Sequence, residues 1–595
     1  MPVADPAPPR LLGQTRLVPD VGPERRGRAY PRAATSAMLL APATLVLGLF
    51  VAWPVLRIVV ASVTDDDLGF VGLRHFRTAL ELHGAGTVIG RTLLWGALVP
   101  AVVTTLGFAL AIVSRRGRTG RLATFVLVAP IALPLVVTGI VFRLVYDPDP
   151  ARGPVSGSVG LSFLGPRLVT VALMSAFVWA WVGLALVVFR TALDRVRPEL
   201  ADAVLAHGGG RREVFLDARW RPVLRRTFAI VFALVALATV RSFDLILVMA
   251  PGSVLDEASV LGVLQWQTSE GTTTGPSAAL GVIWLAIVIL AVTGAAWWSR
   301  QKWPPPLLLT DDEVAAADDP TAAGMSPPAW RQATRRTVLL AASVLWLFPL
   351  AVLLGTAWQT PRDAAVSGWW HRPTSLESYR VALQGDDLWR SLLLTGALAL
   401  VVACVVTGVA LLAASAIAWT PTVPAQLAGF VLLGAAVVPV QVVAGPIDDV
   451  LRTLHLTDTT FGLGLVHVAL GLPFAVLLLR NALSDVELDR LRRARLAGRR
   501  EWEVVWNLAP SAVTTAIAVF VLEFVQVWND FVVGLLFGGP NAAPLGVVLH
   551  GQSRQFVASS GALAASAVIA SVVPLLLVLV VRRRIVSGLV SGALR

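Results

Sequence analysis

Long apolar runs constrain this chain of 595 residues more than any other feature. A helix needs about 20 consecutive apolar residues to cross a bilayer, and the sequence holds twelve runs of about that length. They fall at 36–63, 92–113, 122–146, 168–189, 227–249, 278–298, 336–358, 391–418, 425–447, 461–483, 512–537 and 561–581. The runs do not alternate in polarity at every second residue, so they favour helices over a membrane barrel. The sequence therefore predicts an all-α integral membrane protein with about twelve transmembrane helices.

The composition supports this fold and excludes several functions. Charged residues make up 14% of the chain, whereas soluble domains carry about 25%. The one cysteine, Cys404, excludes a disulfide framework. Lys302 is the single lysine and lies in no glycine-rich loop, so the chain has no Walker A nucleotide site. The histidines show no metal-ligand spacing. We expect no cofactor and no metal.

Arginine placement predicts the orientation. Arginines crowd the segment before the first run and most segments after even-numbered runs, whereas residues 250–277 contain no Arg or Lys. Basic residues stay on the cytoplasmic side of a membrane protein. We therefore expect a plasma-membrane protein with both termini in the cytoplasm. This placement also explains the net charge of +12 without nucleic acid binding.

The chain repeats one plan twice. His75–Leu80 resembles Ser378–Leu383, and Arg91–Leu94 resembles Arg390–Leu393. A polar, proline-rich segment separates the repeats and reads as a linker. The predicted divisions are a cytoplasmic tail at 1–35, a first half at 36–300, a linker at 301–335 and a second half at 336–595. Six spans per half keep the halves in one orientation, related by an axis along the membrane normal.

The segment between the fourth and fifth spans predicts a helix, a glycine turn and a second helix. Pro198 can begin a helix, and the glycines at 208–210 end it. Such a compact unit on the cytoplasmic face suits docking of a partner. The alternative is an arginine-rich anchoring loop with no partner.

The chain resembles the permease subunits of binding-protein-dependent ABC importers, in the carbohydrate (maltose and glycerol-phosphate) branch. Phe70–Phe76 resembles the segment after that family's first span, and Ser242–Met249 resembles the end of its fifth span. Pro373–Tyr379 and Trp528–Phe531 resemble the partner subunit. The family normally uses two separate permease chains, which here look fused. The resemblance implies a type I-like importer permease with two pseudo-symmetric six-helix halves.

The resemblance also implies partners and coupling residues. A separate ATPase dimer would receive one cytoplasmic helix from each half, an extracytoplasmic solute-binding protein would deliver a sugar or polyol, and lipid would surround the chain. The family's coupling motif falls on Asp202, Ala203, His207, Gly208, Gly209 and Phe215 in the first half. In the second half it falls on Leu491, Ala497, Gly498 and Pro510, without its initial glutamate.

Polar and aromatic residues inside the spans are candidates for the substrate path. Charged groups within a membrane usually face a cavity or a partner, and aromatic rings stack on sugars. The candidates are Trp179, Phe243, Asp244, Glu523, Trp528, Asn529 and Asp530, with Asp530 placed to correspond to Asp244. The alternative for the charged groups is pairing between helices, and for the tryptophans it is packing or an interfacial belt.

Three other functions stay open. An ion-gradient-driven secondary transporter also has twelve spans, although the long cytoplasmic segments argue against it. A membrane enzyme acting on lipid-linked sugars would need acidic or histidine groups clustered at one surface, and the sequence shows no such cluster. An ABC permease for a vitamin, polyamine or metal chelate is the third.

Overall fold

The fold is taken from a computed structural model of the chain. The structure describes residues 33–65, 69–115, 117–194, 196, 198–210, 212, 216, 223–269, 274–299, 328–370, 374–384, 386–419, 425–484, 488–497, 499–540 and 542–593. Within these ranges every regular element is a helix, and the one β-bridge joins Thr64 to Phe70. The predicted all-α membrane fold is confirmed.

Nine of the described helices are long and apolar enough to cross a membrane, and a bent pair makes a tenth. The nine contain α2 (Ala33–Leu47) with η1 (Gly48–Ala52) and α3 (Trp53–Ala61), α5 (Ala85–Ser114), α9 (Val169–Asp194), α16 (Thr274–Ser299), α18 (Ala329–Ala357), α21 (Asp386–Trp419), α24 (Thr460–Ser484), α26 (Glu501–Leu508) with η6 (Ala509–Ala512) and α27 (Val513–Trp528), and α30 (Phe556–Ala593). The bent pair is α6 (Gly117–Val128), extended by η2 (Ala129–Ala132), with α7 (Leu135–Val145). The other two predicted spans appear as shorter apolar helices, α12 (Arg225–Val240) and α22 (Ala425–Val437).

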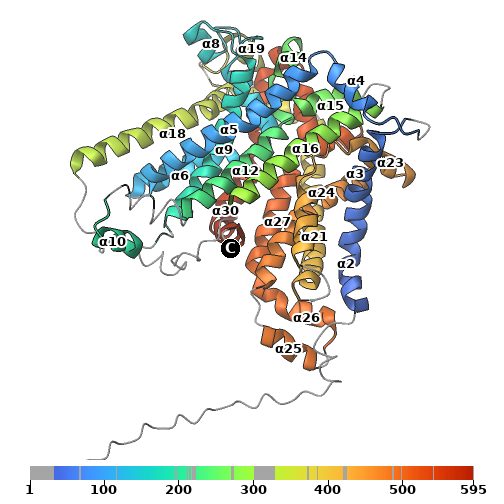
Figure 1. The fold of residues 1–595 in the computed structure, drawn as a ribbon. Coiled ribbons are helices and arrows are strands. Elements are labelled where there is room, and N and C mark those ends of the chain that lie inside the picture. The colour runs from blue at the N-terminus through green and yellow to red at the C-terminus, as the bar shows by residue number, and fades with distance from the viewer. Residues whose placement is uncertain are drawn as a thin grey trace, which may run out of the picture.

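Short helices gather at the two ends of the molecule. The upper end in Figure 1 carries α4 (Arg74–Glu81), α8 (Pro154–Val159), α14 (Leu255–Ala258), α15 (Leu261–Ser269), α19 (Pro361–Ser367) and α23 (Ala444–Thr453). The lower end carries α10 (Pro198–Ala206), α25 (Leu488–Leu496) and α26. Four more short helices are α13 (Asp244–Met249), α20 (Glu377–Gln384), α28 (Val532–Phe537) and α29 (Leu545–Ser553).

The third span of each half is broken near a proline. The chain bends by 107° between the end of η2 and α7, where Leu133 is extended and Pro134 follows. A residue before proline is pushed out of the helical region, which explains the extended Leu133. In the second half, α22 ends at Val437 and Pro439 precedes α23. The predictions of unbroken spans at 122–146 and 425–447 were therefore wrong in their upper parts.

The first span of each half packs against the other half. The first-half helix α2 contacts α21 and α24, and α3 contacts α23, all from the second half. Conversely, α18 of the second half contacts α5, α6 and α7 of the first half. Figure 1 shows α2 and α3 beside the second half, and α18 along the far edge of the first half. Each half is thus completed by a helix from the other.

Matched contacts confirm the two-fold plan. Gly275 at the start of α16 packs so closely on the His75 ring that an added Cβ would clash with it. Gly561 in α30 packs in the same way on the Ser378 hydroxyl. These contacts agree with the predicted correspondence of His75 and Ser378.

A second pair of contacts corrects the register of the repeat. The Leu261 amide donates to Thr92 Oγ1 at 2.8 Å, and the Leu545 amide donates to Thr395 Oγ1 at 2.9 Å. Thr92 therefore corresponds to Thr395. The pairing of Arg91 with Arg390 that the sequence suggested is displaced by about one helical turn.

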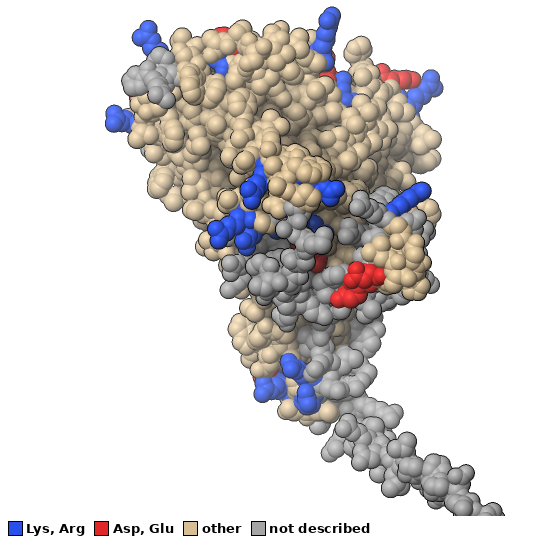
Figure 2. All heavy atoms as spheres, turned by 90° about the vertical axis from the view of Figure 1, so that its left-hand side faces the viewer, with Lys and Arg blue, Asp and Glu red and all other residues tan. Residues whose placement is uncertain are grey.

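The two bundles meet at the upper end and spread apart toward the lower end. In Figure 1 the first-half helices α5, α9, α12 and α16 run obliquely, while α21, α24 and α27 run nearly vertically, so that α10 lies far from α25. Figure 2 shows a zone with few charged side chains on one face, between charged side chains at the upper rim and a band of Lys and Arg side chains lower down. Such a zone matches the hydrocarbon layer of a membrane.

Candidate functional site

The fifth span of each half breaks at matching positions. Arg241 caps the end of α12 and Asn529 caps the end of α27, with nearly identical backbone angles. Phe243 and Phe531 then precede the six-residue helices α13 and α28. This alignment pairs Asp530 with Ser242, so the expectation that Asp530 corresponds to Asp244 was wrong by two residues. No proline marks these breaks.

The two caps reach across the molecule. The Asn529 side-chain amide donates to the Ala132 carbonyl at 3.2 Å, where the third span of the first half breaks. Arg241 Nη1 donates to the Ala436 carbonyl at 3.5 Å, beside the break in the third span of the second half. We call these two contacts the cross-half bonds. They join the breaks of the third and fifth spans reciprocally, and so tie the halves together where the bundles meet.

Acidic groups lie beside these breaks. Asp530 accepts the Val533 and Gly534 amides at 3.4 and 3.1 Å, which caps α28. His467 of α24 lies 3.9 Å from Asp530. The Ser242 hydroxyl and the Asn529 carbonyl oxygen are buried without a partner in the described part of the chain. The site thus offers carboxylates, an imidazole and spare hydrogen-bonding atoms to a polar solute.

Glu523 is buried between two helices of the second half. Its side chain is 2% exposed, and its Oε2 atom has no hydrogen-bond partner among the described residues. A Cβ on Gly471 would lie 2.2 Å from that oxygen, so the glycine of α24 makes room for the carboxyl. In this conformation Glu523 faces α24, and its assignment to the substrate path stays a prediction.

The predicted path tryptophans are engaged in packing. The Trp179 indole donates to the Trp346 carbonyl at 2.9 Å, and the Trp346 indole donates back to the Trp179 carbonyl at 3.2 Å. This reciprocal pair fastens α18 to the first half. The Trp528 indole donates to the Ala570 carbonyl at 3.0 Å, which joins α27 to α30.

Phe243 is also packed, because it is fully buried and meets Trp266 edge to face at 5.5 Å. These environments favour the packing alternative for Trp179, Phe243 and Trp528. They leave Asp244, Asn529 and Asp530 as the predicted path residues nearest the junction of the halves.

The segment predicted to couple to an ATPase in the first half forms the expected helix and glycine turn. Asp202, Ala203 and Leu205 are exposed on α10, and His207 Nδ1 lies 2.7 Å from the Ala203 carbonyl oxygen. Gly208 has a φ of +81°, and the Gly209 amide donates to the Val204 carbonyl at 2.9 Å. This is the Schellman arrangement that ends a helix at a left-handed glycine. Phe215 lies outside the described residues.

The corresponding segment of the second half is held by an ion pair rather than by a left-handed glycine. Leu491 is buried on α25, and the Ala497 amide donates to the Arg493 carbonyl at 3.0 Å. Arg495 then bonds both oxygens of Glu501, at 3.0 and 3.2 Å, across the turn into α26. Pro510 lies in η6, where α26 leads into α27, and Gly498 lies outside the described residues. A buried ion pair thus holds the turn between α25 and α26.

The sequence marks Arg241 and Arg143 as charged groups near the outer ends of their spans, and Arg241 as a candidate to pair with Asp244, but it does not indicate their partners in the other half. Ser242 was missed, and only the three-dimensional break gives it a role. Arg143 of α7 donates to the Ser553 carbonyl at 3.0 Å, which is another contact between the halves. The partnership of Arg495 with Glu501 carried no sequence signal beyond opposite charge.

Comparison with known proteins identifies the family. A family model described as the binding-protein-dependent transport system inner membrane component matches residues 103–302 and again residues 417–590, which is more than half of the chain. The chain belongs to this family. The resemblance inferred from sequence motifs is confirmed, and one family match falls in each predicted half. The chain is therefore a multi-pass permease component of a transport system rather than an enzyme.

Curated relatives match less than half of this permease. It is 28% identical over 279 residues to the osmoprotective compounds uptake permease protein GgtD of Synechocystis, which is 45% of this chain and 93% of the relative. It is 28% identical over 264 residues to the trehalose transport system permease protein SugB of Mycobacterium tuberculosis, which is 42% of this chain and 91% of the relative. It is 24% identical over 269 residues to the alpha-glucoside transport system permease protein AglF of Rhizobium meliloti, covering 42% and 78%. Each relative is matched over most of its own length but less than half of this chain, as expected for two permeases fused in one chain.

A solved structure of a bacterial ABC transporter for import of the polysaccharide alginate matches 44% of this chain and 94% of its own, with 17% identity and a TM-score of 0.39. That score is too low to carry an argument about geometry.

Proposed function

We propose that this permease imports a sugar or polyol, receives it from an extracytoplasmic solute-binding protein, and is driven by a separate ATPase dimer. The reciprocal pair of cross-half bonds where the bundles meet, with α10 and α25 spread apart at the lower end, is the observation that carries the proposal. A permease closed above and open below is in its inward-facing state. The lower end then faces the cytoplasm, with both termini on that side.

The division of the chain follows the two-fold plan. The first half spans 36–300 and the second 336–595, with a cytoplasmic tail at 1–35 and a cytoplasmic linker at 301–335. Each half supplies six spans, and the swapped first spans make each half depend on the other.

The ATPase docks on α10 and on α25–α26. Both lie at the lower end, one in each half, and each precedes the fifth span of its half. Motion of α10 or α26 is therefore passed directly along α12 or α27 to a cross-half bond. The energy comes from this partner, because the chain has no glycine-rich loop with a lysine for nucleotide phosphates.

The two docking helices differ in charge. On α10 the charged side chains are Glu199 and Asp202, both exposed, whereas the exposed charged side chains described on α25 are Arg490 and Arg493. Charged surfaces choose complementary partners and reject like charges. The two clefts of the ATPase dimer therefore differ in charge, with a basic rim facing α10 and an acidic rim facing α25.

The solute passes between the halves beside Asp244, Asn529 and Asp530. Carboxylates, an amide and the Ser242 hydroxyl accept and donate hydrogen bonds, as the hydroxyl groups of a sugar or polyol require. Relatives named for osmoprotective compounds, alpha-glucosides and trehalose support this class of solute.

Co-purification and reconstitution test the proposal. The chain is purified with its ATPase and placed in vesicles containing ATP, with solute-binding protein and labelled trehalose outside. Uptake should require both partners and ATP. Replacing the exposed Leu205 of α10 by aspartate should release the ATPase, whereas Thr334→Asp, which adds the same charge on exposed α18 surface, should not. Accumulation by the chain alone under an ion gradient would establish a secondary transporter and refute the proposal.

A further inference from the structure

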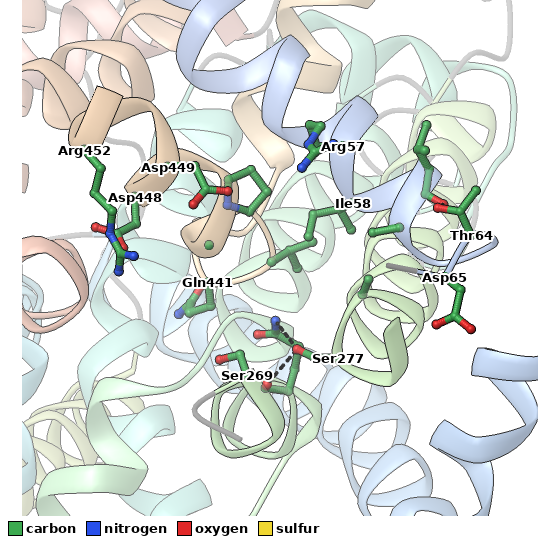
Figure 3. A pocket seen from close by; sticks show the side chains of 17 residues that line it. Arg57, Ile58, Thr64, Asp65, Ser269, Ser277, Gln441, Asp448, Asp449 and Arg452 are labelled. Atoms are coloured by element: carbon green, nitrogen blue, oxygen red, sulfur yellow. Dashed lines mark hydrogen bonds and ion pairs between the residues drawn. The ribbon is translucent and has the colours of Figure 1, made fainter. Parts of the chain in front are cut away.

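A polar cavity lies at the upper end, away from the junction that the cross-half bonds close. It has a volume of about 490 Å³ and is lined by α3, α15, α16 and α23. That volume is within the ~300–1,000 Å³ of small-molecule sites. Figure 3 shows Arg57 of α3 on one side of the cavity and Asp449 of α23 on the other, with Ser269 and Ser277 below. The cavity therefore spans the seam between the swapped first span and the second half.

The lining is built for a charged, hydrogen-bonding group. Gln441 is only 5% exposed, and its side-chain amide makes no hydrogen bond within the described ranges. The Gln265 carbonyl oxygen is likewise buried without a partner there, while its amide donates to Ser277 at 3.2 Å. Buried amide groups without partners are costly. An occupant with polar atoms would satisfy them.

One cation and one anion in the cavity have no partner of opposite charge in the described part of the chain. Arg452 pairs with Asp448, one turn away on α23, and Asp65 of the lining pairs with Arg74 of α4. In the described part of the chain, by contrast, Arg57 has no carboxylate partner and Asp449 has no basic one. A zwitterion, with an anionic and a cationic group, complements this pair, whereas a neutral sugar does not. The lining also contains no aromatic ring on which a sugar could stack.

The cavity continues into an apolar groove. A neighbouring pocket of about 340 Å³ shares Arg57, Pro446 and Asp449 and adds Leu49, Trp53, Val450 and Leu454. Leu49, Trp53 and Leu454 are substantially exposed, at 36%, 48% and 45%. An occupant with a polar head in the cavity and an apolar tail in this groove would cover all of these groups.

The depth of these residues matches a lipid. Arg57 lies four residues, or about 6 Å, below the upper end of α3, and the headgroup layer of a bilayer is roughly 5–8 Å thick on each side. Trp53 and Leu49 lie about 6 and 12 Å deeper, at the level of acyl chains. The polar part of the site thus faces lipid headgroups and the apolar part faces lipid tails.

At the matching seam, between α18 and the first half, the structure has an apolar pocket of about 470 Å³ with no charged side chain in its lining. At the same seam, Arg152 pairs with Asp147 at 3.1 Å and donates to the Ala365 carbonyl of α19 at 3.1 Å. A Cβ on Gly368 would come within 2.7 Å of Arg152 Cα, so α8 and α19 meet without a gap. The charged lining of the cavity is therefore a feature of one seam and not a consequence of the two-fold plan.

We propose that this cavity and groove bind one phosphatidylethanolamine molecule of the upper leaflet, with its phosphate on Arg57 and its ammonium on Asp449. The primary ammonium also donates to the carbonyl oxygen of Gln441, which a trimethylated choline headgroup does not. An anionic headgroup would leave Asp449 unpaired. The bound lipid joins α3 to α23 and so holds the swapped first span against the second half.

Lipid retention tests the assignment. The full chain is purified in mild detergent from membranes containing phosphatidylethanolamine, phosphatidylcholine and phosphatidylglycerol in equal amounts, and retained lipids are counted by native mass spectrometry. Phosphatidylethanolamine should be retained at least about five-fold over each of the others. The double variant Arg57→Gln with Asp449→Asn should lose this preference. Both side chains are exposed, so the variant should keep its fold.

A matched control separates this site from general charge effects. Arg77→Gln with Glu81→Gln removes an exposed pair of the same charges from α4 at the same end of the molecule, and should leave the preference unchanged. Thermal unfolding with added phosphatidylethanolamine should show a shift in Tm that the double variant lacks. Equal retention of the three lipids, an unchanged preference in the double variant, or displacement of the lipid by trehalose would each overturn the assignment.

Discussion

Removal of the two cross-half bonds should let the upper end of the permease open. The change is Asn529→Ala with Arg241→Met, which deletes both donors and keeps the apolar length of the arginine. The Asn529 bond to Ala132 is 3.2 Å long and joins neutral groups, so it contributes about 0.5–1.5 kcal/mol to the closed state. The Arg241 bond to Ala436 is longer, at 3.5 Å, but has a charged donor, so we assign it about 1.5 kcal/mol, the lower end for such bonds.

Together the two losses amount to roughly 2–3 kcal/mol, which is a 30- to 150-fold shift toward the open upper end. The bonds come from different halves and share no partner, so their effects should add. Each single variant should therefore show its own smaller shift, and Arg241→Lys, which keeps a charged donor, should fall between Arg241→Met and the parent.

Thiol accessibility measures this opening. Cys404 is the chain's one cysteine and is removed first by Cys404→Ala. Ser242→Cys then places a thiol one residue from Arg241, at a position that is 2% exposed. A membrane-impermeant maleimide added from the upper side should modify it 30 to 150 times faster in the double variant. Ser391→Cys, a buried position at the upper end of α21 that bonds the Ala543 carbonyl, serves as the control and should not change.

Two results would refute this reasoning. An unchanged modification rate at position 242 would mean that the cross-half bonds do not hold the upper end closed. An equal rise at positions 242 and 391 would mean that the variant loosens the whole fold rather than the junction of the halves.

The other predictions concern coupling and packing. Gly208→Ala, at a φ of +81° with open space around it, should cost α10 about 1–2 kcal/mol and weaken ATPase retention, while Gly86→Ala at an ordinary helical position should not. Gly471→Ala should lower the unfolding free energy by about 1–3 kcal/mol through contact with Glu523, and a double-mutant cycle with Glu523→Ala should recover most of that loss. Arg495→Ala should cost about 3–5 kcal/mol because it leaves Glu501 buried alone, whereas Arg495→Met with Glu501→Leu should be nearly neutral in chemical denaturation. Proteolytic cleavage at a site inserted between residues 300 and 327 should leave ATP-driven uptake unchanged, and a loss of uptake with both fragments still bound would contradict the swapped arrangement.

The sequence predicted the elements whose signals are local. The apolar run at 92–113 became α5 and that at 168–189 became α9, because a continuous run of this length has no other stable form in a membrane. The glycine turn after α10 was also predictable, since a left-handed position strongly favours glycine. The break at Pro134 carried a signal as well, but apolar length alone masked it.

The remaining features depend on contacts between distant segments. Arg241 and Asn529 end their helices without proline or glycine, and their partners lie 195 and 397 residues away. The reciprocal bonds of Trp179 and Trp346 could not be read from the sequence, because an indole in an apolar helix is equally compatible with packing, stacking or an interfacial belt. The swap of the first spans left no trace for a similar reason: a helix that is apolar on every side does not indicate its neighbour.

The swap also explains how two fused halves can still move. The linker joins α16 to α18, and both belong to the oblique bundle of the first half, because α18 packs on α6 and α7. The fusion therefore connects two parts of one moving body and does not cross the gap between the bodies. The segments that do cross are those from α3 to α4 and from α19 to α21, at the upper end. When the two bundles rock about the upper end, the distance that the linker spans stays nearly constant. Fusion of the halves therefore fixes their one-to-one ratio and does not restrain the motion that transport requires.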